Sequence, residues 1–161
     1  MLIRDEQPAD AAAIRALLEI VFPQPDEAKL VDLLRRDGDV AVSLVAVENG
    51  APVGHVLLSP MTAPFRAVGL APLAVAPHRQ GAGIGGQLVR AALAQAEADG
   101  WQGVFVVGDP DYYRRFGFAP ELAAGFASPY AGPYLMALAL GPALPTTTGE
   151  VAYAPAFAGL E

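Results

Sequence analysis

One stretch decides the fold of this chain, and it reads Leu73-Ala74-Val75-Ala76-Pro77-His78-Arg79-Gln80-Gly81-Ala82-Gly83-Ile84-Gly85-Gly86. Its beginning continues a strand pattern, and its end opens an amphipathic helical pattern. Glycines between a strand and a helix let the backbone approach a ligand closely. The first N–H groups of a helix lack partners within it, and the helix dipole adds partial positive charge there. The stretch therefore predicts a phosphate site.

Two nucleotide motifs can be compared with this loop. A phosphate loop of the nucleoside-triphosphatase kind needs Gly-Lys-Ser/Thr where this chain has Gly85-Gly86-Gln87, so that motif is excluded. The dinucleotide fingerprint is met by Gly81, Gly83 and Gly86. It also needs an acid at the end of the next strand, whereas Glu97 lies on the helix. A dinucleotide-binding protein stays an alternative at this point.

Strand patterns precede the loop. Residues 40–47 and 53–58 flank Asn49-Gly50, which is a strong hairpin signal. Residues 66–75 form the next predicted strand. Pro72 interrupts it, and because a proline inside a strand belongs at an edge or a bulge, we expect the strand to bend there.

The pattern after the loop is helix, strand, short helix, strand. The first helix ends at Asp99-Gly100, and residues 101–107 form a strand. Asp109-Pro110 starts a short helix with a good N-cap, and Gly117 ends it. Residues 134–140 read as a buried strand, and residues 151–153 suit a last one.

The N-terminal part contributes a short strand at Ile3-Arg4 and two helices. One begins at Pro8, and the other runs from Pro25 to Gly38, which is placed to cap it. The element order predicts an α/β fold of the α+β type, with helices on both faces of one sheet. The length of 161 residues suits a single domain over residues 1–161.

Composition narrows the function further. A net charge of −7 argues against nucleic-acid partners and mildly favours a cationic substrate. The absence of cysteine excludes thiolate metal sites and cysteine nucleophiles; it fits the cytoplasm, and we expect no metal. The N-terminus is no signal peptide. Residues 122–149 lack charge, but prolines and glycines interrupt them, so no membrane span is expected.

Two motifs together resemble the GNAT superfamily of N-acetyltransferases, in particular its bacterial predicted N-acetyltransferase branch. Gln80-Gly81-Ala82-Gly83-Ile84-Gly85 matches the Gln/Arg-x-x-Gly-x-Gly/Ala signature, and Tyr113-Arg114-Arg115-Phe116-Gly117-Phe118 matches Tyr-x-x-x-Gly-Phe. The resemblance implies a mostly antiparallel sheet splayed at a central bulge. It also implies transfer of an acetyl group from acetyl-CoA to an amine of a small molecule or peptide, by a monomer or homodimer.

The same resemblance implies the cofactor contacts. The backbone of the strand end would bind the pantetheine arm and the acetyl carbonyl, and the loop would hold the pyrophosphate. The residues concerned are Leu73, Ala74, Val75, Gln80, Gly81, Ala82, Gly83, Ile84, Gly85 and Gly86. Arg79 is a candidate for extra charge at the phosphates.

By the same resemblance Tyr113 is the general acid. Tyr112 and Phe116 share an i, i+4 helix face, which indicates packing. The base is open, because residues 70–75 contain no carboxylate where many relatives carry a glutamate. His55 is the best local candidate, with a hydrogen-bonded structural histidine, a bound water or Glu121 as alternatives. A module that binds acetyl-CoA without catalysis is a further alternative.

The acceptor amine is expected between two segments, residues 21–25 and residues 122–134. The second is apolar and aromatic, with Phe126, Tyr130 and Tyr134 in or beside it. These side chains form either a pocket for an apolar substrate or part of the core.

Overall fold

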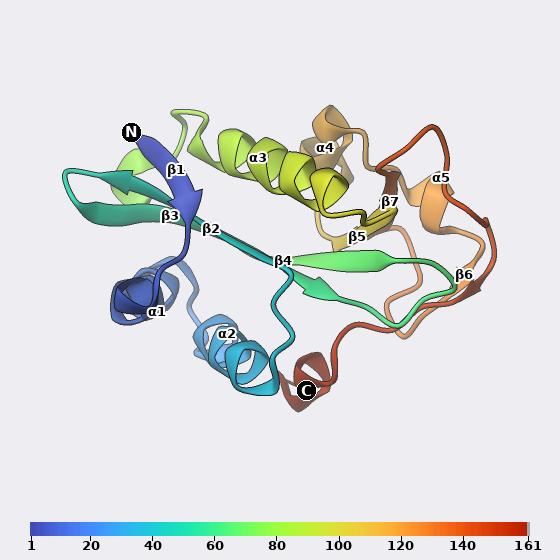
Figure 1. Cartoon of the computed structure of the whole chain (residues 1–161), viewed down its shortest axis with the longest axis horizontal. Helices are drawn as coiled ribbons and strands as arrows, with labels where there is room; N and C mark the ends of the chain where they lie inside the picture. Colours follow the sequence, from blue (N-terminus) through green and yellow to red (C-terminus); the bar gives the residue numbers. More distant parts are fainter. Residues whose placement is uncertain (161) are drawn as a thin grey trace.

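A six-stranded sheet runs through the molecule, seen nearly edge-on in Figure 1. The computed structural model describes residues 1–160. The strands are β1 (Leu2–Asp5), β2 (Val42–Glu48), β3 (Ala51–Pro60), β4 (Ala67–Val75), β5 (Gly103–Val107) and β7 (Leu135–Ala139). They lie in the order β1-β2-β3-β4-β5-β7. All neighbours are antiparallel except β4 and β5, which confirms the predicted mixed, mostly antiparallel sheet.

Helices cover both faces of the sheet, as the sequence predicts. Helix α3 (Ile84–Ala98) lies on one face, and α1 (Ala11–Val21) and α2 (Asp26–Asp37) lie on the other (Figure 1). The C-terminal 3-10 helix η4 (Pro155–Leu160) packs against α2 on that second face. Two separate layers of side chains therefore sandwich the sheet.

The alternation of side chains along the strands explains the two layers. Leu44 and Ala46 of β2 join the cluster beneath α3, while Val45 between them joins the cluster beneath α1 and α2. Leu88 of α3 and Leu34 of α2 are fully buried in these two clusters. Each such leucine contributes about 1.5–3 kcal/mol relative to an exposed one, so burial on both faces holds the helices to the sheet.

Local chemistry sets the ends of α2. Asp26 and Glu27 occupy its first turn and Arg35 and Arg36 its last turn, which complements the helix dipole at both ends. Gly38 follows in the left-handed conformation with φ of +74°, which glycine adopts without a steric penalty. The predicted helix end at Gly38 is confirmed.

Strands β4 and β5 separate halfway along their length. Their parallel pairing ends where Gly69 lies opposite Phe105. On its other edge β4 stays paired with β3 as far as Val75, and a register shift sets Ala71 and Pro72 against the single residue Leu57. The bulge predicted from Pro72 is thus confirmed. Because a bulge bends its strand, the outer half of β4 leaves β5, and the sheet is splayed.

Residues 110–150 differ in part from the sequence prediction. The short helix α4 (Pro110–Tyr113) lies where it was expected, with the Asp109 side chain accepting a hydrogen bond from the backbone N–H of Asp111. Helix α5 (Pro120–Ala123) and strand β6 (Phe126–Ala127) were not predicted.

The expected last strand over residues 151–153 was misplaced. Strand β8 (Gly149–Glu150) pairs instead with β6 in a separate two-stranded sheet. Of the expected residues, Ala152 makes one isolated bridge, with Thr62. Pairs of this length have no periodicity that a sequence pattern could show. Within residues 1–160, every helix falls short of the length and apolar character that crossing a membrane requires.

Candidate active site

The glycine-rich loop joins β4 to α3 in a conformation that suits glycine. Gly81 and Gly83 have φ of +83° and +84°, where side chains are strained. A Cβ added at either position would meet no atom within 4 Å. Gln80 donates a hydrogen bond from Nε2 to the carbonyl oxygen of Val75 at 3.0 Å, which ties the loop to the end of β4. The start of α3 is therefore left open to an anionic ligand.

A groove of about 630 Å³ runs along this loop. Its volume lies in the range typical of small-molecule sites. It is lined by the end of β4, the loop, the first turn of α3 and α4, including Leu73, Val75, Gln80, Gly81, Gly83, Ile84, Gly85, Gly86 and Tyr112. The structure thus brings eight of the ten predicted cofactor residues together at one groove.

The other two predicted contacts, Ala74 and Ala82, are not among the groove-lining residues. The side chain of Ala74 is buried in the core beneath α1 and α2, and Ala82 is exposed on the turn. Ile84 lines the groove, but its side chain is only 2% exposed and packs in the core beneath α3. Ala74 and Ile84 can therefore reach a ligand mainly through their backbone.

The free edge of β4 adds a second kind of binding surface. Beyond Gly69 the edge of β4 that faces β5 has no strand partner, because the pairing has stopped. Leu73 and Val75 lie on this unpaired part and line the groove. An extended ligand arm that lies in the gap would find backbone groups free to hydrogen-bond.

Three arginines line the groove, and two of them, Arg90 and Arg115, were not among the predicted cofactor contacts. The guanidinium of Arg90 lies 4.9 Å from the centre of the Phe116 ring, and that of Arg115 lies 4.4 Å from the centre of the Tyr112 ring. Within residues 1–160, neither forms an ion pair with a carboxylate. Both line the groove, so both are free to meet an anion.

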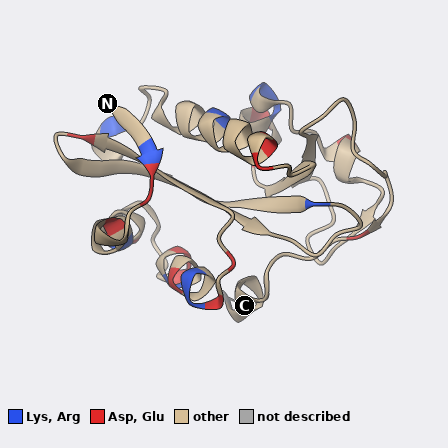
Figure 2. Cartoon of the chain, viewed as in Figure 1, with Lys and Arg blue, Asp and Glu red and all other residues tan. Residues whose placement is uncertain are grey.

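Arg79, the cation considered from the sequence, is already engaged. Its Nε and Nη2 donate to the two carboxylate oxygens of Glu48 at 2.7 and 2.8 Å. The hydrogen bond from the Arg79 guanidinium outweighs the effect of burial and holds the pKa of Glu48 below its usual range. Figure 2 shows basic residues on α3 and α4 as well as on α2 and β1, and acidic residues on α1, on α2 and at the end of α3. Arg90 and Arg115 are therefore better placed than Arg79 to meet an anion in the groove.

The two tyrosines of α4 point in different directions. Tyr113 packs on Gly108, where an added Cβ would lie 2.6 Å from its ring. Burial, with a smaller contribution from Tyr112, raises the pKa of Tyr113 to about 12, so its hydroxyl keeps its proton at neutral pH. The hydroxyl of Tyr112 lies 3.0 Å from the position of a Cβ on Gly85. Tyr112 packs with Phe116 as predicted, but it also lines the groove.

His55 does not face the groove. Its side chain has no exposed surface, and it lies opposite Val45 and Ala74, which belong to the layer of α1 and α2. Its Nε2 is 3.0 Å from Ser43 Oγ, which itself donates to Glu6 at 2.9 Å. Since Ser43 has one proton to give, His55 Nε2 must be the donor, and the remaining Nδ1 is buried. This placement argues against His55 as the base and supports the hydrogen-bonded alternative.

Two carboxylates differ in their availability. Glu121 is exposed and accepts a hydrogen bond from Arg114 at 3.0 Å, so its charge is already balanced. Glu27, in the first turn of α2, has a buried Oε2 that finds no partner in the described part of the chain. Glu27 therefore has a carboxylate oxygen without a hydrogen-bond partner in the described part of the chain, whereas the charge of Glu121 is already paired with Arg114.

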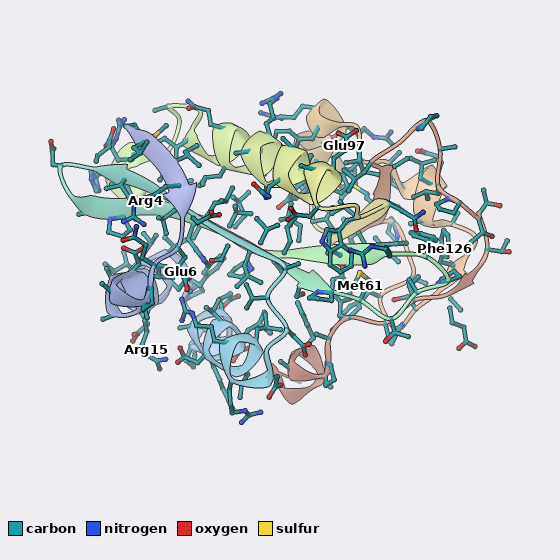
Figure 3. All side chains as sticks on the ribbon, viewed as in Figure 1. Arg4, Glu6, Arg15, Met61, Glu97 and Phe126 are labelled. Carbon is teal, nitrogen blue, oxygen red and sulfur yellow. The ribbon has the colours of Figure 1, made fainter. Side chains whose placement is uncertain are left out.

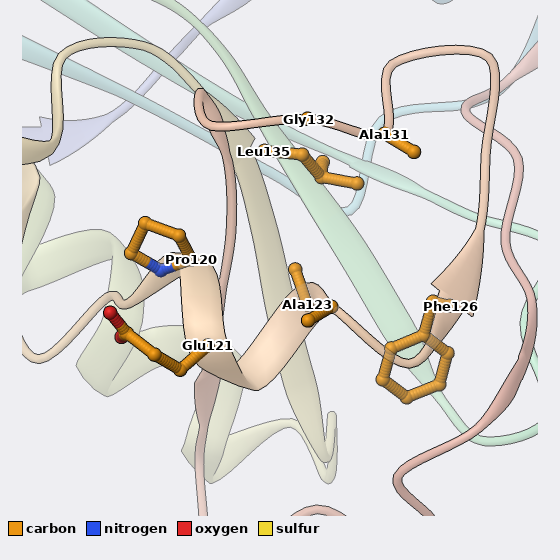
Figure 4. A pocket seen from close by; sticks show the side chains of 8 residues that line it. Pro120, Glu121, Ala123, Phe126, Ala131, Gly132 and Leu135 are labelled. Carbon is orange, nitrogen blue, oxygen red and sulfur yellow. The ribbon is translucent and has the colours of Figure 1, made fainter.

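The aromatic side chains expected at the acceptor site lie in different environments. Phe126 is core, stacked edge-on against Phe105 with ring centres 5.4 Å apart, while Tyr134 is 60% exposed. A pocket of about 410 Å³ lies between α5 and the start of β7 (Figure 4). It is lined by Pro120, Ala123, Phe126 and Leu135, with Glu121 at its edge. None of the predicted catalytic or cofactor residues lines it.

A smaller pocket lies where β4 and β5 part. It measures about 110 Å³ and is lined by Leu70, Ala71, Val107, Tyr130, Tyr153 and Phe157. Of the aromatic residues expected at the acceptor site, it includes only Tyr130. Tyr153 and Phe157 come from the C-terminal segment, and the sequence offered no signal that would bring them there.

Several known proteins are similar to this chain in sequence and in structure. Residues 11–118 match the Acetyltransferase (GNAT) family. The Escherichia coli K12 protein described as uncharacterized N-acetyltransferase YhbS is 44% identical over 128 residues, which cover 77% of this chain and 75% of that protein.

Two solved structures are similar over nearly the whole chain. The crystal structure of YhbS from Escherichia coli in complex with CoA superposes with a TM-score of 0.92 at 37% identity, covering 98% of this chain and 91% of that one. A GNAT family acetyltransferase from Brucella melitensis in complex with acetyl-CoA gives a TM-score of 0.83 at 41% identity, covering 97% of both chains. The splayed sheet, the glycine loop and these likenesses agree, and the chain belongs to the GNAT family of acetyltransferases.

Proposed function

We propose that this acetyltransferase moves the acetyl group of acetyl-CoA to a primary amine of a small molecule or peptide. The observation that carries the proposal is the splay after Gly69, which opens an unpaired strand edge directly beside a glycine loop and a helix start. A phosphate group and an extended pantetheine arm need those two surfaces side by side. The complexes of the two solved relatives with CoA and acetyl-CoA support the same ligand.

Each part of the groove then has a role. The N–H groups from Gly81 to Gly86 would hold the pyrophosphate, with Arg90 and Arg115 adding charge. The backbones of Leu73 and Val75 would bind the pantetheine arm and the acetyl carbonyl. Gln80 acts on the loop and not on the ligand, because its amide donates to the carbonyl oxygen of Val75.

The chemistry is a direct attack. The amine nitrogen bonds to the thioester carbonyl carbon, and a tetrahedral intermediate forms that carries the negative charge on oxygen. When it collapses, the carbon–sulfur bond breaks and Tyr113, whose raised pKa keeps its hydroxyl protonated, gives its proton to the departing sulfur of CoA. The tyrosinate then takes a proton back from water, which restores the acid. The amine gives up its own proton to water, because His55 is enclosed and the strand edge from Leu70 to Val75 carries no carboxylate.

A non-catalytic acetyl-CoA-binding module is the second candidate. It is favoured by one observation, that the strand edge from Leu70 to Val75 carries no carboxylate base. The dinucleotide alternative loses its support, since the loop follows the antiparallel pair β3 and β4 and the family is now known.

One pair of measurements tests the proposal. Calorimetric titration should show binding of acetyl-CoA and none of NAD. A colorimetric thiol assay across a panel of amines should then show release of CoA, with no background from the protein, which has no cysteine. Binding of acetyl-CoA without turnover on any amine would favour the non-catalytic module. Binding of NAD alone would refute both the acetyltransferase and the non-catalytic module.

A further inference from the structure

The small pocket between β4 and β5 lies at the vertex of the splay. Leu70 and Ala71 follow Gly69 directly, and Val107 ends β5, so all three lie just beyond the last paired residues. The aromatic wall belongs to the face of the sheet away from α3. Tyr130 and Tyr153 pack on the cluster around Phe105 on that face, and Phe157 packs on the cluster beneath α1 and α2. The pocket therefore approaches the gap from the side opposite the glycine loop.

Tyr153 brings an unused polar group to this pocket. Its ring packs so closely on Gly69 that an added Cβ there would collide with it. Its hydroxyl oxygen is buried and has no hydrogen-bond partner among the described residues. Burial, with smaller contributions from Tyr130 and Tyr113, raises the pKa of Tyr153, so its hydroxyl keeps its proton. A buried hydroxyl without a hydrogen-bond partner costs free energy, so the pocket favours a ligand that accepts a hydrogen bond from it.

The rest of the pocket is mostly apolar, with the Tyr130 hydroxyl as its other polar side-chain group, and it carries no charge. Tyr130 meets Tyr153 edge-on with ring centres 5.5 Å apart, and Phe157 lies 4.8 Å from Tyr153. No Asp, Glu, Lys or Arg lines the space, and residues 122–149 carry no charge either. A charged group would lose its hydration there without gaining a counter-charge. The volume of about 110 Å³ is somewhat below the ~150 Å³ of apolar cavities that bind benzene.

We infer that this pocket selects the acceptor: it takes a compact primary amine with an uncharged, apolar body and one oxygen that accepts a hydrogen bond from Tyr153. This inference rests on the proposed acetyl transfer and narrows its substrate class. It disfavours polyamines, which bring extra positive charge, and free amino acids, which bring a carboxylate. In this division of roles Tyr153 recognises the substrate, while Tyr113 serves the leaving group.

Four amines of graded chemistry test the inference. Leucinamide has an apolar body and a carbonyl oxygen, isopentylamine lacks the oxygen, leucine carries a carboxylate and spermidine carries extra charge. We expect kcat/KM for leucinamide to exceed that for leucine and for spermidine by about tenfold or more. Preference for spermidine or leucine would overturn the inference.

The variant Tyr153→Phe tests the role of the hydroxyl. We expect it to lower kcat/KM for leucinamide about tenfold, as for a lost hydrogen bond, and to leave isopentylamine and the KM of acetyl-CoA unchanged. Its melting temperature should not fall, because the deleted hydroxyl has no protein partner. Tyr134→Phe, at a 60% exposed position, is the control and should behave as wild type.

The remaining outcomes separate this inference from the proposed function. A lower melting temperature in Tyr153→Phe, or an equal loss with isopentylamine, would show a structural hydroxyl and overturn the inference. A change in the preference for butyryl-CoA over acetyl-CoA would place the acyl group, not the amine, in the pocket, and would also overturn it. Failure of acetyl-CoA itself to bind would instead refute the proposed function.

Discussion

At the residue scale, the two adjacent tyrosines of α4 should separate in kinetics. Tyr113→Phe removes only a proton donor, so we expect kcat to fall about 10²–10⁴-fold with the KM of acetyl-CoA nearly unchanged. Tyr112 has its hydroxyl beside Gly85 in the groove. Tyr112→Phe should therefore weaken acetyl-CoA binding a few fold and keep kcat. Steady-state kinetics of both variants measure this, and equal activity of Tyr113→Phe and wild type would refute the assignment of the acid.

A partly buried charge cluster beside β1 should set the acid stability of the protein. Arg35 donates to both oxygens of Glu6 at 2.7 and 3.0 Å, and Ser43 and His55 complete the cluster. Burial alone would raise the pKa of Glu6, but His55, Arg35 and Ser43 together outweigh it and lower the pKa to about 2. For His55 burial has the opposite sign: it lowers the pKa, because it disfavours the charged imidazolium, and this outweighs the opposing effect of Glu6.

The sign of the pH dependence is the same for both groups. A folded pKa below the unfolded one means that the unfolded chain binds the proton more readily, so stability is lost as pH falls. We expect the loss to begin below about 6.5 through His55 and to steepen from about 4.5 towards 2 through Glu6. Urea unfolding at a series of pH values measures it.

The variant Glu6→Gln isolates one part of that dependence. It should cost about 2 kcal/mol at neutral pH through lost charged hydrogen bonds, and it should flatten the curve below pH 4.5. Glu97→Gln is the control, because Glu97 is exposed on α3, on the other side of the sheet (Figure 3). A curve for Glu6→Gln that parallels wild type would contradict this account.

At the scale of elements, the turn into α3 and the end of α2 form a matched pair. Gly83 and Gly38 have φ of +84° and +74°, and a Cβ on either would meet nothing within 4 Å. Valine at either position should therefore cost a similar amount through backbone strain, about 1–2 kcal/mol. Only Gly83→Val should also weaken acetyl-CoA, by more than about tenfold, because its side chain would stand where the pyrophosphate approaches the backbone.

Calorimetry with acetyl-CoA and thermal unfolding of both variants check this pair. Comparable melting temperatures with a binding defect in Gly83→Val alone are the expected result. If Gly38→Val weakened the ligand as much, the effect would come from general destabilisation. If neither did, the phosphates would lie elsewhere.

At the scale of the whole molecule, a chain of net charge −7 must attract a ligand that is itself an anion. Arg90 and Arg115 concentrate positive charge at the groove to offset this. Arg90→Gln and Arg115→Gln should each raise the Kd of acetyl-CoA about fivefold, and the difference from wild type should shrink at high salt. Arg114→Gln is the control, since Arg114 pairs with Glu121 and does not line the groove.

The sequence by itself determined the features that depend on local backbone chemistry. The bulge at Pro72, the helix ends at Gly38 and Gly117 and the N-cap at Asp109 follow from what a proline, a glycine or a carboxylate does to its own neighbours. The glycine loop belongs to the same class. Its motif was sufficient to indicate the family because a glycine turn between a strand and a helix needs only consecutive residues.

Only the tertiary structure decided which distant side chains meet. His55 was expected near the gap, but strand register turns it to the layer of Glu6 and Ser43, and register is not visible in a single strand. Tyr153 reaches Gly69 because the C-terminal segment folds back over the face of α2, a path that no local pattern encodes. The glycine loop could thus be predicted from the sequence, while the small pocket that we propose for the acceptor, assembled from four separate segments, could not.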